Sequence, residues 1–234
     1  MSNTTFSDAE LLRYSRQILL PDWDIDAQLN LKSARVLMIG MGGLGCPAAQ
    51  VLARAGLGFL RMVDFDTVDE SNLQRQLLFH ADDIGQPKVL AAKNSLSKIN
   101  QWLEIDAIVE RVTPENLPEL LQNIDLVLDG SDNFETRDQI NQACVRAKIP
   151  LLSAAAIGVE GQISLFQAAT GCYRCVFPDA PEDADAAPIL ACWPVPPQRL
   201  GQYRHTPRCC TLGLAKRRWP VAYCCGMACH SINA

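Results

Sequence analysis

Acidic residues are missing from the last part of this chain. All 26 aspartates and glutamates precede residue 186, whereas residues 186–234 contain six Arg or Lys, six Pro, six Cys and two Trp. Folded domains normally carry surface charges of both signs. The break in composition therefore excludes one uniformly built domain of 234 residues and separates a tail from the residues before it.

Long apolar runs are also missing. No run reaches the roughly 18 residues that suggest a membrane-spanning helix, and the opening MSNTTFSDAE lacks the basic and apolar regions of a secretory signal. The net charge of −5 provides no excess of positive charge for nucleic acid. We therefore expect a cytoplasmic protein whose partner is neither a membrane nor a nucleic acid.

Histidine is scarce, whereas cysteine is plentiful. His80, His205 and His230 are scattered and form no catalytic pattern, and ten cysteines are many for the cytoplasm. In that compartment, cysteines bind metals more often than they form disulfides. Cys172 and Cys175 form a CxxC pair, which we interpret as half of a zinc site that needs two further ligands.

The strongest pattern begins at residue 35. An apolar strand leads into glycines at G-x-G-x-x-G spacing, namely Gly40, Gly42 and Gly45, and a small-residue helix and a second strand follow. The second strand ends in Asp64, nineteen residues after the last glycine. This order is typical of a dinucleotide-binding unit, in which glycines let backbone N–H groups approach phosphates and the acid holds a ribose hydroxyl.

Further polar residues follow the predicted strands. The sequence SNLQRQ at 71–76 places an amide and a guanidinium just past the ribose acid, and a dehydrogenase does not need them. Lys88 opens a predicted helix, where the helix dipole disfavours a cation, so we expect an anion nearby. Asp132 and Asn133 follow a strand, where open α/β sheets place their ligands, although Asp132 could simply cap the next helix.

Hydrophobic periodicity predicts the element order β-α-β-α-β-α-β-α-β-β. Such alternation implies a Rossmann-like α/β fold, a doubly wound and mostly parallel sheet with helices on both faces, whose C-terminal part is incomplete or aberrant. Ser7 and Glu10 form a capping box for a first helix, in which the pattern alone predicts that Arg13 and Arg16 are solvated. The apolar side of this helix consists of Leu11, Leu12, Ile18 and Leu19.

Taken together, the motifs resemble the MoeB/ThiF/HesA family of bacterial activators of small ubiquitin-fold sulfur carriers, which are similar to the adenylation half of ubiquitin-activating enzymes. The resemblance covers roughly residues 7–183, and its motifs are jointly specific. They are RYSRQILL at 13–20, GMGGLG at 40–45, DFDTV at 64–68, SNLQRQ at 71–76, GQPK at 85–88, LDGSDN at 128–133 and CYRC at 172–175.

The resemblance implies an adenylyltransferase. The C-terminal carboxylate of the carrier attacks the α-phosphate of MgATP, and carrier acyl-adenylate and pyrophosphate result. The implied nucleotide-binding residues are Gly40, Gly42, Gly43, Gly45, Asp64, Ser71, Asn72, Leu73, Gln74, Arg75, Lys88, Asp132 and Asn133. No general base is needed, because a carboxylate is already ionised at pH 7.

The resemblance also implies individual roles. Asp64 takes the ribose, Asp132 binds Mg²⁺, and Asn72, Arg75 and Lys88 hold the phosphates. The implied catalytic residues are Arg16, Arg75, Lys88 and Asp132. Arg16 reaches the phosphates of the other protomer, which makes a homodimer part of the site and replaces the solvated role that the helix pattern predicts. Cys172 and Cys175 bind Zn²⁺ together with a second CxxC in the family.

The tail matches no motif of this family. In the family, CYRC is followed by a glycine-rich helix, further strands and the second CxxC, and none of them is visible in residues 186–234. Our hypothesis is a shift of reading frame near residue 185. Residues 1–184 then form the ATP-binding adenylation domain with half a zinc knuckle, and residues 185–234 form an aberrant tail that we expect to be poorly ordered.

Several functions stay open at this point. GVEGQISLF at 158–166 and FHADDIGQPK at 79–88 favour the activator of the molybdopterin carrier, whereas RYSRQILL and GCYRC fit the activator of the thiamine carrier equally well. An NAD(P)-dependent oxidoreductase of the same fold would need a nicotinamide pocket and a proton relay, and SNLQRQ argues against it. A third alternative is a frameshifted product that binds nucleotide without turnover.

Overall fold

One six-stranded sheet organises the chain. A computed structural model describes residues 5–157, 160–167 and 171–177, so the predicted tail at 185–234, with its cysteines, His205 and His230, lies outside the described residues. The strands are β1 (Arg35–Ile39), β2 (Phe59–Val63), β3 (Glu104–Ile108), β4 (Leu126–Asp129), β5 (Leu151–Ile157) and β6 (Glu160–Phe166). Their order in the sheet is β3-β2-β1-β4-β5-β6, and β6 runs antiparallel to β5 while the other neighbours are parallel. The predicted α/β fold with a mostly parallel sheet is confirmed.

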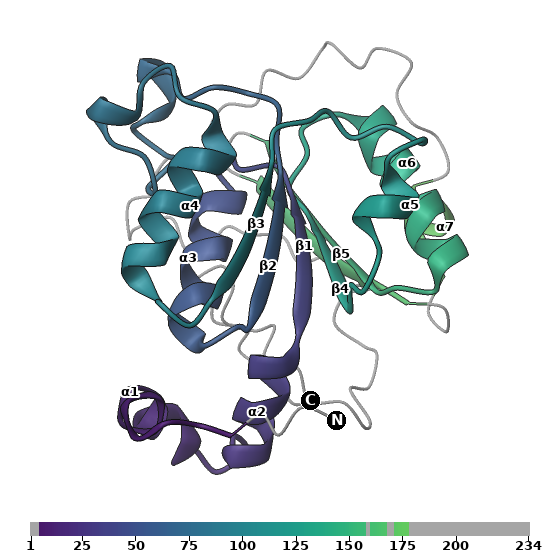
Figure 1. Ribbon diagram of the computed structural model, residues 1–234. Helices are drawn as coiled ribbons and strands as arrows, with labels where there is room; N and C mark the ends of the chain where they lie inside the picture. Colours follow the sequence, from purple (N-terminus) through teal and green to yellow (C-terminus); the bar gives the residue numbers. More distant parts are fainter. Residues whose placement is uncertain (1–4, 158–159, 168–170, 178–234) are drawn as a thin grey trace.

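Helices cover both faces of this sheet. The longer ones are α1 (Asp8–Ile18), α2 (Ile25–Ser33), α3 (Gly45–Ala55), α4 (Lys88–Ile99) and α6 (Phe134–Ala147), and the short ones are α5 (Leu117–Leu120) and α7 (Tyr173–Val176) with the 3-10 turns Glu70–Asn72 and Ala81–Asp83. Helices α3 and α4 lie on one face, whereas α5, α6 and α7 lie on the other (Figure 1). Among the residues that the structure describes, none of the helices has the length and apolar content of a membrane span.

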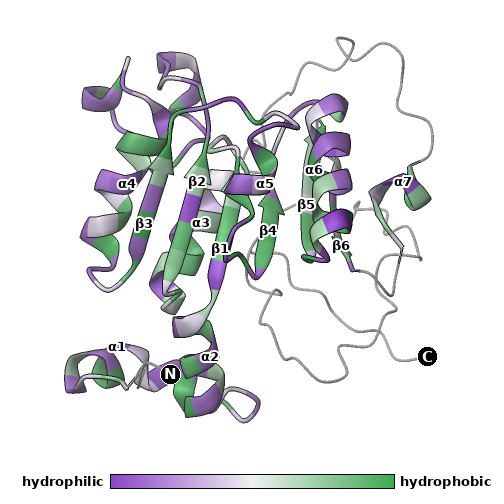
Figure 2. Cartoon of the chain, turned by 45° about the vertical axis from the view of Figure 1, so that its right-hand side comes forward, coloured by the Kyte–Doolittle hydropathy of each residue, from purple (hydrophilic) through white to green (hydrophobic). Residues whose placement is uncertain are grey.

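The central strands are buried from both sides. In β1, Val36 and Met38 belong to the core cluster beneath α3 and α4, whereas Leu37 and Ile39 belong to the cluster beneath α5 and α6. This alternation follows from the two-residue period of a strand. In Figure 2, β1 and β4 are mostly hydrophobic, while the edge strand β3 carries hydrophilic residues.

The order of strands creates a switch point between β1 and β4. The chain proceeds from β1 to β2 and β3 in one direction and then returns to β4 on the other side of β1. The N–H of Gly130 donates to the carbonyl of Ile39 at 2.9 Å, so the turns that follow β1 and β4 lie side by side. Doubly wound sheets bind their ligands at such a point, outside the carboxyl ends of the strands.

Helices α1 and α2 lie at the opposite end, where β1 begins (Figure 1). The predicted capping box of α1 is confirmed, since Ser7 and Glu10 satisfy each other's backbone N–H groups. The apolar side of α1 is not its buried side: Leu12 and Leu19 are each 78% exposed, whereas Glu10 and Tyr14 are buried. Arg13 is not simply solvated, because it donates to the carbonyl of Ile99 and lies over the ring of Trp102.

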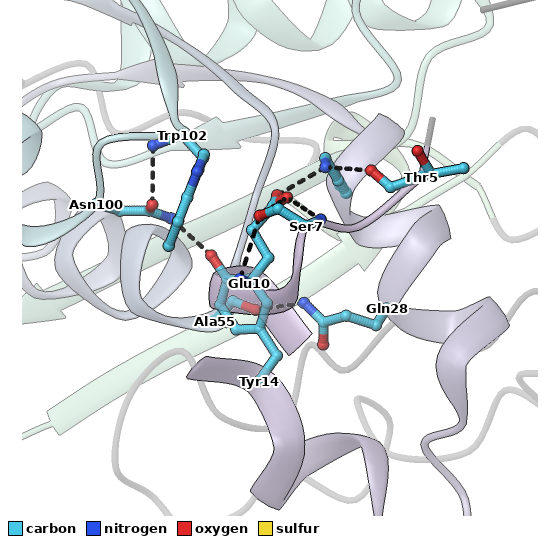
Figure 3. A network of polar contacts seen from close by, with 9 residues as sticks. Thr5, Ser7, Glu10, Tyr14, Gln28, Ala55, Asn100 and Trp102 are labelled. Carbon is cyan, nitrogen blue, oxygen red and sulfur yellow. Dashed lines mark hydrogen bonds and ion pairs between the residues drawn. The ribbon is translucent and has the colours of Figure 1, made fainter. Parts of the chain in front are cut away.

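A set of paired polar groups, which we call the amino-end network, joins these two helices to the rest of the domain (Figure 3). The fully buried side chain of Gln28 donates to the carbonyl of Ala55 at 2.8 Å and accepts from Trp23 at 2.8 Å. Asn100 donates to the hydroxyl of Tyr14 at 3.0 Å. The sequence pattern missed α2, because its buried face is formed by a glutamine as well as by Leu31.

Candidate functional site

Two of the glycines after β1 are required by the fold. Gly40 has a φ of +88°, and a Cβ there would lie 2.9 Å from the carbonyl oxygen of Gly130. A Cβ on Gly45 would lie 2.0 Å from the carbonyl oxygen of Gly40, which is far inside van der Waals contact. These two glycines therefore allow the close packing of β1, β4 and α3.

The other two glycines are not required by the fold. Neither has a positive φ, and a Cβ would meet ordinary contacts, 3.8 Å from Gln76 Nε2 at Gly42 and 3.6 Å from Arg75 Cδ at Gly43. Both glycines are partly exposed at the turn that opens α3, whose first residues have no side-chain cap. The N-terminus of a helix attracts anions, so this turn is a candidate site for a phosphate group.

Asp64 lies at the carboxyl end of β2 and is tied to this turn. Its Oδ2 accepts from the N–H of Met41 at 2.7 Å, and its Oδ1 accepts from the N–H of Asp66 at 2.8 Å. Burial raises the pKa of Asp64 above its ordinary value, although these two hydrogen bonds oppose the shift. The predicted ribose acid is therefore bonded to Met41, the residue that immediately precedes Gly42.

The motif at 71–76 folds over the same turn. Arg75 Nη2 donates to Oδ1 of Asn72 at 2.7 Å, and Arg75 Nη1 donates to the carbonyl of Ser71 at 3.1 Å. Because Arg75 also lies beside Gly43, the predicted amide and guanidinium do converge on the glycine turn. The other predicted residues of the motif do not join them: Leu73 packs on the core and Gln74 is exposed.

Gln76 was not predicted as a site residue. It is 3% exposed, and within the described part of the chain its Oε1 is buried without a hydrogen-bond partner. A buried polar atom without a partner costs about 1–3 kcal/mol. Its Nε2 lies 3.8 Å from the position that a Cβ on Gly42 would take. Its place as the last residue of the polar motif was the available sequence signal.

Lys88 is buried at the start of α4, and the anion expected beside it is a carboxylate of the chain itself. Its Nζ lies 2.8 Å from Oδ2 of Asp66, a residue that the sequence did not suggest. The backbone N–H of Asp66 also donates to Oδ1 of Asp64. Lys88 is therefore connected through Asp66 to the predicted ribose acid, Asp64.

Asn133, rather than Asp132, caps helix α6. Its Oδ1 accepts from the N–H of Thr136 at 2.8 Å. The alternative that Asp132 serves as the cap is therefore wrong. The carboxylate of Asp132 is exposed and accepts from the side chain of Asn133 at 3.3 Å, so Asp132 remains accessible to a cation at the end of β4.

The CxxC pair lies away from this turn, on α7 beside α6 (Figure 1). The Sγ atoms of Cys172 and Cys175 are 3.6 Å apart, and two thiolates of a tetrahedral zinc site lie about 3.8 Å apart. Burial would raise the pKa of Cys172, but hydrogen bonds from the Cys175 N–H and other groups lower it below its ordinary value. Residues 5–157, 160–167 and 171–177 contain no cluster of three metal-binding side chains.

Arg16 does not reach the glycine turn of its own chain. It is exposed on α1, which lies at the amino ends of the strands, whereas the turn follows the carboxyl end of β1 (Figure 1). Any contact of Arg16 with a nucleotide therefore requires a second copy of the chain.

Comparison with known proteins gives a consistent family. The profile of the ThiF family matches residues 14–196. The chain is 49% identical to the molybdopterin-synthase adenylyltransferase of Escherichia coli (strain K12), over 73% of this chain and 69% of that protein. It is 45% identical to the sulfur carrier protein ThiS adenylyltransferase of the same organism, over 75% and 71%.

Solved structures agree with the fold. The structure titled E. coli MccB with MccA-N7isoASN superposes with a TM-score of 0.66 at 30% identity, over 70% of this chain. The chain spans half of the length of that protein. The family profile covers every predicted site residue, from Arg16 to Cys175, and ends eleven residues beyond the predicted break in the chain.

Proposed function

The chain belongs to the ThiF family, and we propose that it activates the C-terminal glycine of a small ubiquitin-fold sulfur carrier by adenylation with ATP. The prediction of an adenylyltransferase is supported by the names of both bacterial relatives. The observation that carries the proposal is the pair of glycines Gly42 and Gly43, which the fold does not require and which lie beside Gln76 and Arg75. It lies at the switch point of the sheet, beside Asp64.

The residues at this turn are suited to a nucleotide. Asp64 has lone pairs left on both carboxylate oxygens to accept ribose hydroxyls. Arg75, oriented by Asn72, offers guanidinium N–H groups to phosphate oxygens. Lys88 adds a buried positive charge, provided that a phosphate replaces or joins Asp66 as its partner. These cations lower the repulsion between the carrier carboxylate and the triphosphate.

The cation that accompanies ATP would be held at Asp132. Mg²⁺ is usually bound by one or two carboxylates together with phosphates of the substrate, so a single exposed carboxylate at the end of β4 fits it. Bound there, Mg²⁺ would neutralise charge on the phosphates. This chain contributes the carboxylate of Asp132 and holds it in place, while the attacking carboxylate belongs to the carrier. An oxygen of the carrier carboxylate forms a bond to the α-phosphorus of ATP, and the bond between that phosphorus and pyrophosphate breaks.

We further propose that the active form is a homodimer. Arg16 would reach the phosphates of the second protomer, in accordance with its exposure on α1 far from its own glycine turn. Leu12 on the same helix and Leu19, its C-cap residue, are each 78% exposed, and an apolar surface of this kind is a candidate subunit contact. We propose a cytoplasmic location for this enzyme.

Zinc binding at the CxxC pair is also part of the proposal. The 3.6 Å separation of the two Sγ atoms and the lowered pKa of Cys172 suit a pair of thiolate ligands. Two more ligands would have to come from outside the described residues. A site of this kind would be structural, because it lies on α7, away from the glycine turn.

Exchange of labelled pyrophosphate into ATP tests the activity. We expect exchange that depends on a purified carrier and is faster with the carrier of molybdopterin synthase than with ThiS, since the relatives' names and identities favour the former. Faster exchange with ThiS would place the chain in the thiamine pathway. Exchange with neither carrier, in a chain that binds ATP, would contradict the enzymatic proposal and support a nucleotide-binding product without turnover.

Asp132→Ala tests the proposed cation site. We expect it to abolish exchange without unfolding the domain, because the carboxylate is exposed and does not cap α6. The far-ultraviolet circular dichroism and the unfolding midpoint serve as the control for folding. Exchange at the rate of the unchanged protein would remove Asp132 from the cation site.

A further inference from the structure

A buried ion pair is hydrogen-bonded to Ser131, the residue before Asp132. Asp129 is the last residue of β4 and Arg137 is in the first turn of α6, and they are only 2% and 8% exposed. Oδ2 of Asp129 lies 3.8 Å from Nε of Arg137, and within the described residues that Nε has no hydrogen-bond partner. Burying such charges has an unfavourable free energy of several kcal/mol per ion, and apolar residues often give equal stability. Stability alone therefore does not explain the pair.

Both members of the pair bind one residue of the loop. Oδ1 of Asp129 accepts from the N–H of Ser131 at 2.9 Å and from its hydroxyl at 2.6 Å. Nη2 of Arg137 donates to the carbonyl of Ser131 and to that of Ala154 at 3.3 Å. Three atoms of Ser131 are thus fixed, and the arginine connects the loop to β5.

The pair is also anchored on the neighbouring strand. Oδ2 of Asp129 accepts from the hydroxyl of Ser153 at 2.8 Å, a residue buried in β5. Ser131 immediately precedes Asp132, and Asn133 immediately follows it and is fixed as the cap of α6. The backbone of Asp132 is therefore held from both sides while its carboxylate stays exposed.

We propose that Asp129 and Arg137 are positioning residues, which fix the loop at 130–133 so that the carboxylate of Asp132 points at the cation bound to the nucleotide phosphates. The inference rests on the proposed function only for the identity of that ligand. Arginine suits this place because its planar guanidinium keeps Nε beside Asp129 while Nη2 donates to the carbonyls of two segments. Lysine would keep the charge beside Asp129 but would lose this geometry.

Arg137→Lys tests the proposal, with Arg146→Lys as the matched control. Arg146 lies on the same helix, is exposed, and donates to Gln142 one turn earlier. In Arg137→Lys we expect amide hydrogen exchange at residues 130–133 to accelerate at least tenfold, and the Mn²⁺ concentration that half-saturates the protein–ATP complex to rise about tenfold. The affinity for ATP without a divalent cation should change less than twofold. The control should match the unchanged protein in all three measurements.

The readouts separate a positioning role from a structural one. If Arg137 were only structural, hydrogen exchange would accelerate throughout α6 and β5, and binding of Mn²⁺ by the folded fraction would not change; that result would overturn the proposal. If Arg137→Lys does not fold, Ser131→Ala removes one bond to Asp129 and should weaken Mn²⁺ binding in the same direction, and an unchanged value would again overturn it. Binding of Mn²⁺ and ATP needs no carrier. A chain without carrier-dependent activity would therefore contradict the proposed function but would leave the test of Arg137 unaffected.

Discussion

The buried carboxamides at the two ends of the sheet differ in their hydrogen bonding. At the amino end, the carboxamides of Gln28 and Asn100 are buried and paired within the chain (Figure 3). At the carboxyl end, Oε1 of Gln76 is buried and has no partner among the described residues, next to Gly42, a glycine that the fold does not require. A satisfied network stabilises one arrangement, whereas an unsatisfied group lowers stability unless a ligand pairs with it. This difference is a reason, independent of the relatives, for proposing the site at the carboxyl end.

The largest expected effect is the loss of folding stability when a glycine that the fold requires is replaced by alanine, compared with a glycine that the fold does not require. Gly45→Ala places a Cβ 2.0 Å from the carbonyl oxygen of Gly40, so we expect a loss of at least about 3 kcal/mol in the free energy of unfolding. Gly43→Ala is the matched control and should lose less than about 1 kcal/mol, since its Cβ meets Arg75 at an ordinary distance. Urea unfolding measures both, and equal losses would remove the distinction between required and open glycines.

The next effect concerns the amino-end network. Gln28→Leu leaves the indole N–H of Trp23 without its acceptor and removes one of the two donors to the carbonyl of Ala55, which keeps Gln17. We expect a loss of about 1–3 kcal/mol in the free energy of unfolding. The affinity of the folded protein for ATP should not change, because the network lies at the far end of the strands. Calorimetric titration below the unfolding transition checks this, and a weaker affinity without loss of stability would contradict the comparison.

A substitution at the carboxyl end should behave in the reverse manner. Gln76→Met removes the unpaired Oε1 while keeping a similar volume, so the free energy of unfolding should stay constant or rise by about 1 kcal/mol. The affinity for ATP should fall about tenfold, which corresponds to one lost hydrogen bond of about 1.4 kcal/mol. Loss of stability with unchanged affinity would show that Gln76 belongs to the structure and not to the site.

A smaller effect is expected from pH. Burial raises the pKa of Asp64, so its protonated form persists above the pH at which an exposed aspartate, with a pKa of about 3.9, ionises. The affinity for ATP should therefore fall as the pH is lowered through this raised pKa, while stability gains from the same protonation. Asp64→Asn should flatten the pH dependence of the affinity. An unchanged dependence in that variant would assign the titration to another group.

The sequence predicted those parts of the structure that follow from local patterns. The glycines, Asp64 and the capping box of α1 each depend on neighbours within one unit of the chain, and their positions are confirmed. The sequence could not show which glycines are required, because the contacts of Gly40 with Gly130 and of Gly42 with Gln76 join distant segments. The same limit explains why Asp66 was missed as the partner of Lys88.

Other errors came from the assumption that polar residues are exposed and apolar residues are buried. Gln28 is fully buried although it is polar, which hid α2, and Leu12 is exposed although it is apolar. Nothing in the sequence singled out Arg137, yet it is buried and bonded to the loop that carries Asp132. Tertiary contacts decided each of these positions, and a single sequence does not contain them.

The frame hypothesis for residues 185–234 stays a prediction. Translating the gene in the other two frames downstream of residue 185 should give a glycine-rich helix and a terminal CxxC. If neither frame does so, the hypothesis is wrong. The carboxyl-end site does not depend on the outcome, because its glycines, Asp64, Arg75 and Gln76 all precede that point.

The central claim is that the turn after β1 is kept open for ATP. Calorimetric titration of ATP into the unchanged protein and into Gly42→Ala tests it most directly, because a Cβ at this position would occupy the space without meeting a contact shorter than 3.8 Å. We predict that the unchanged protein binds ATP and that Gly42→Ala, with a similar unfolding midpoint, binds it at least tenfold more weakly. Equal affinities in two equally stable proteins would contradict the account.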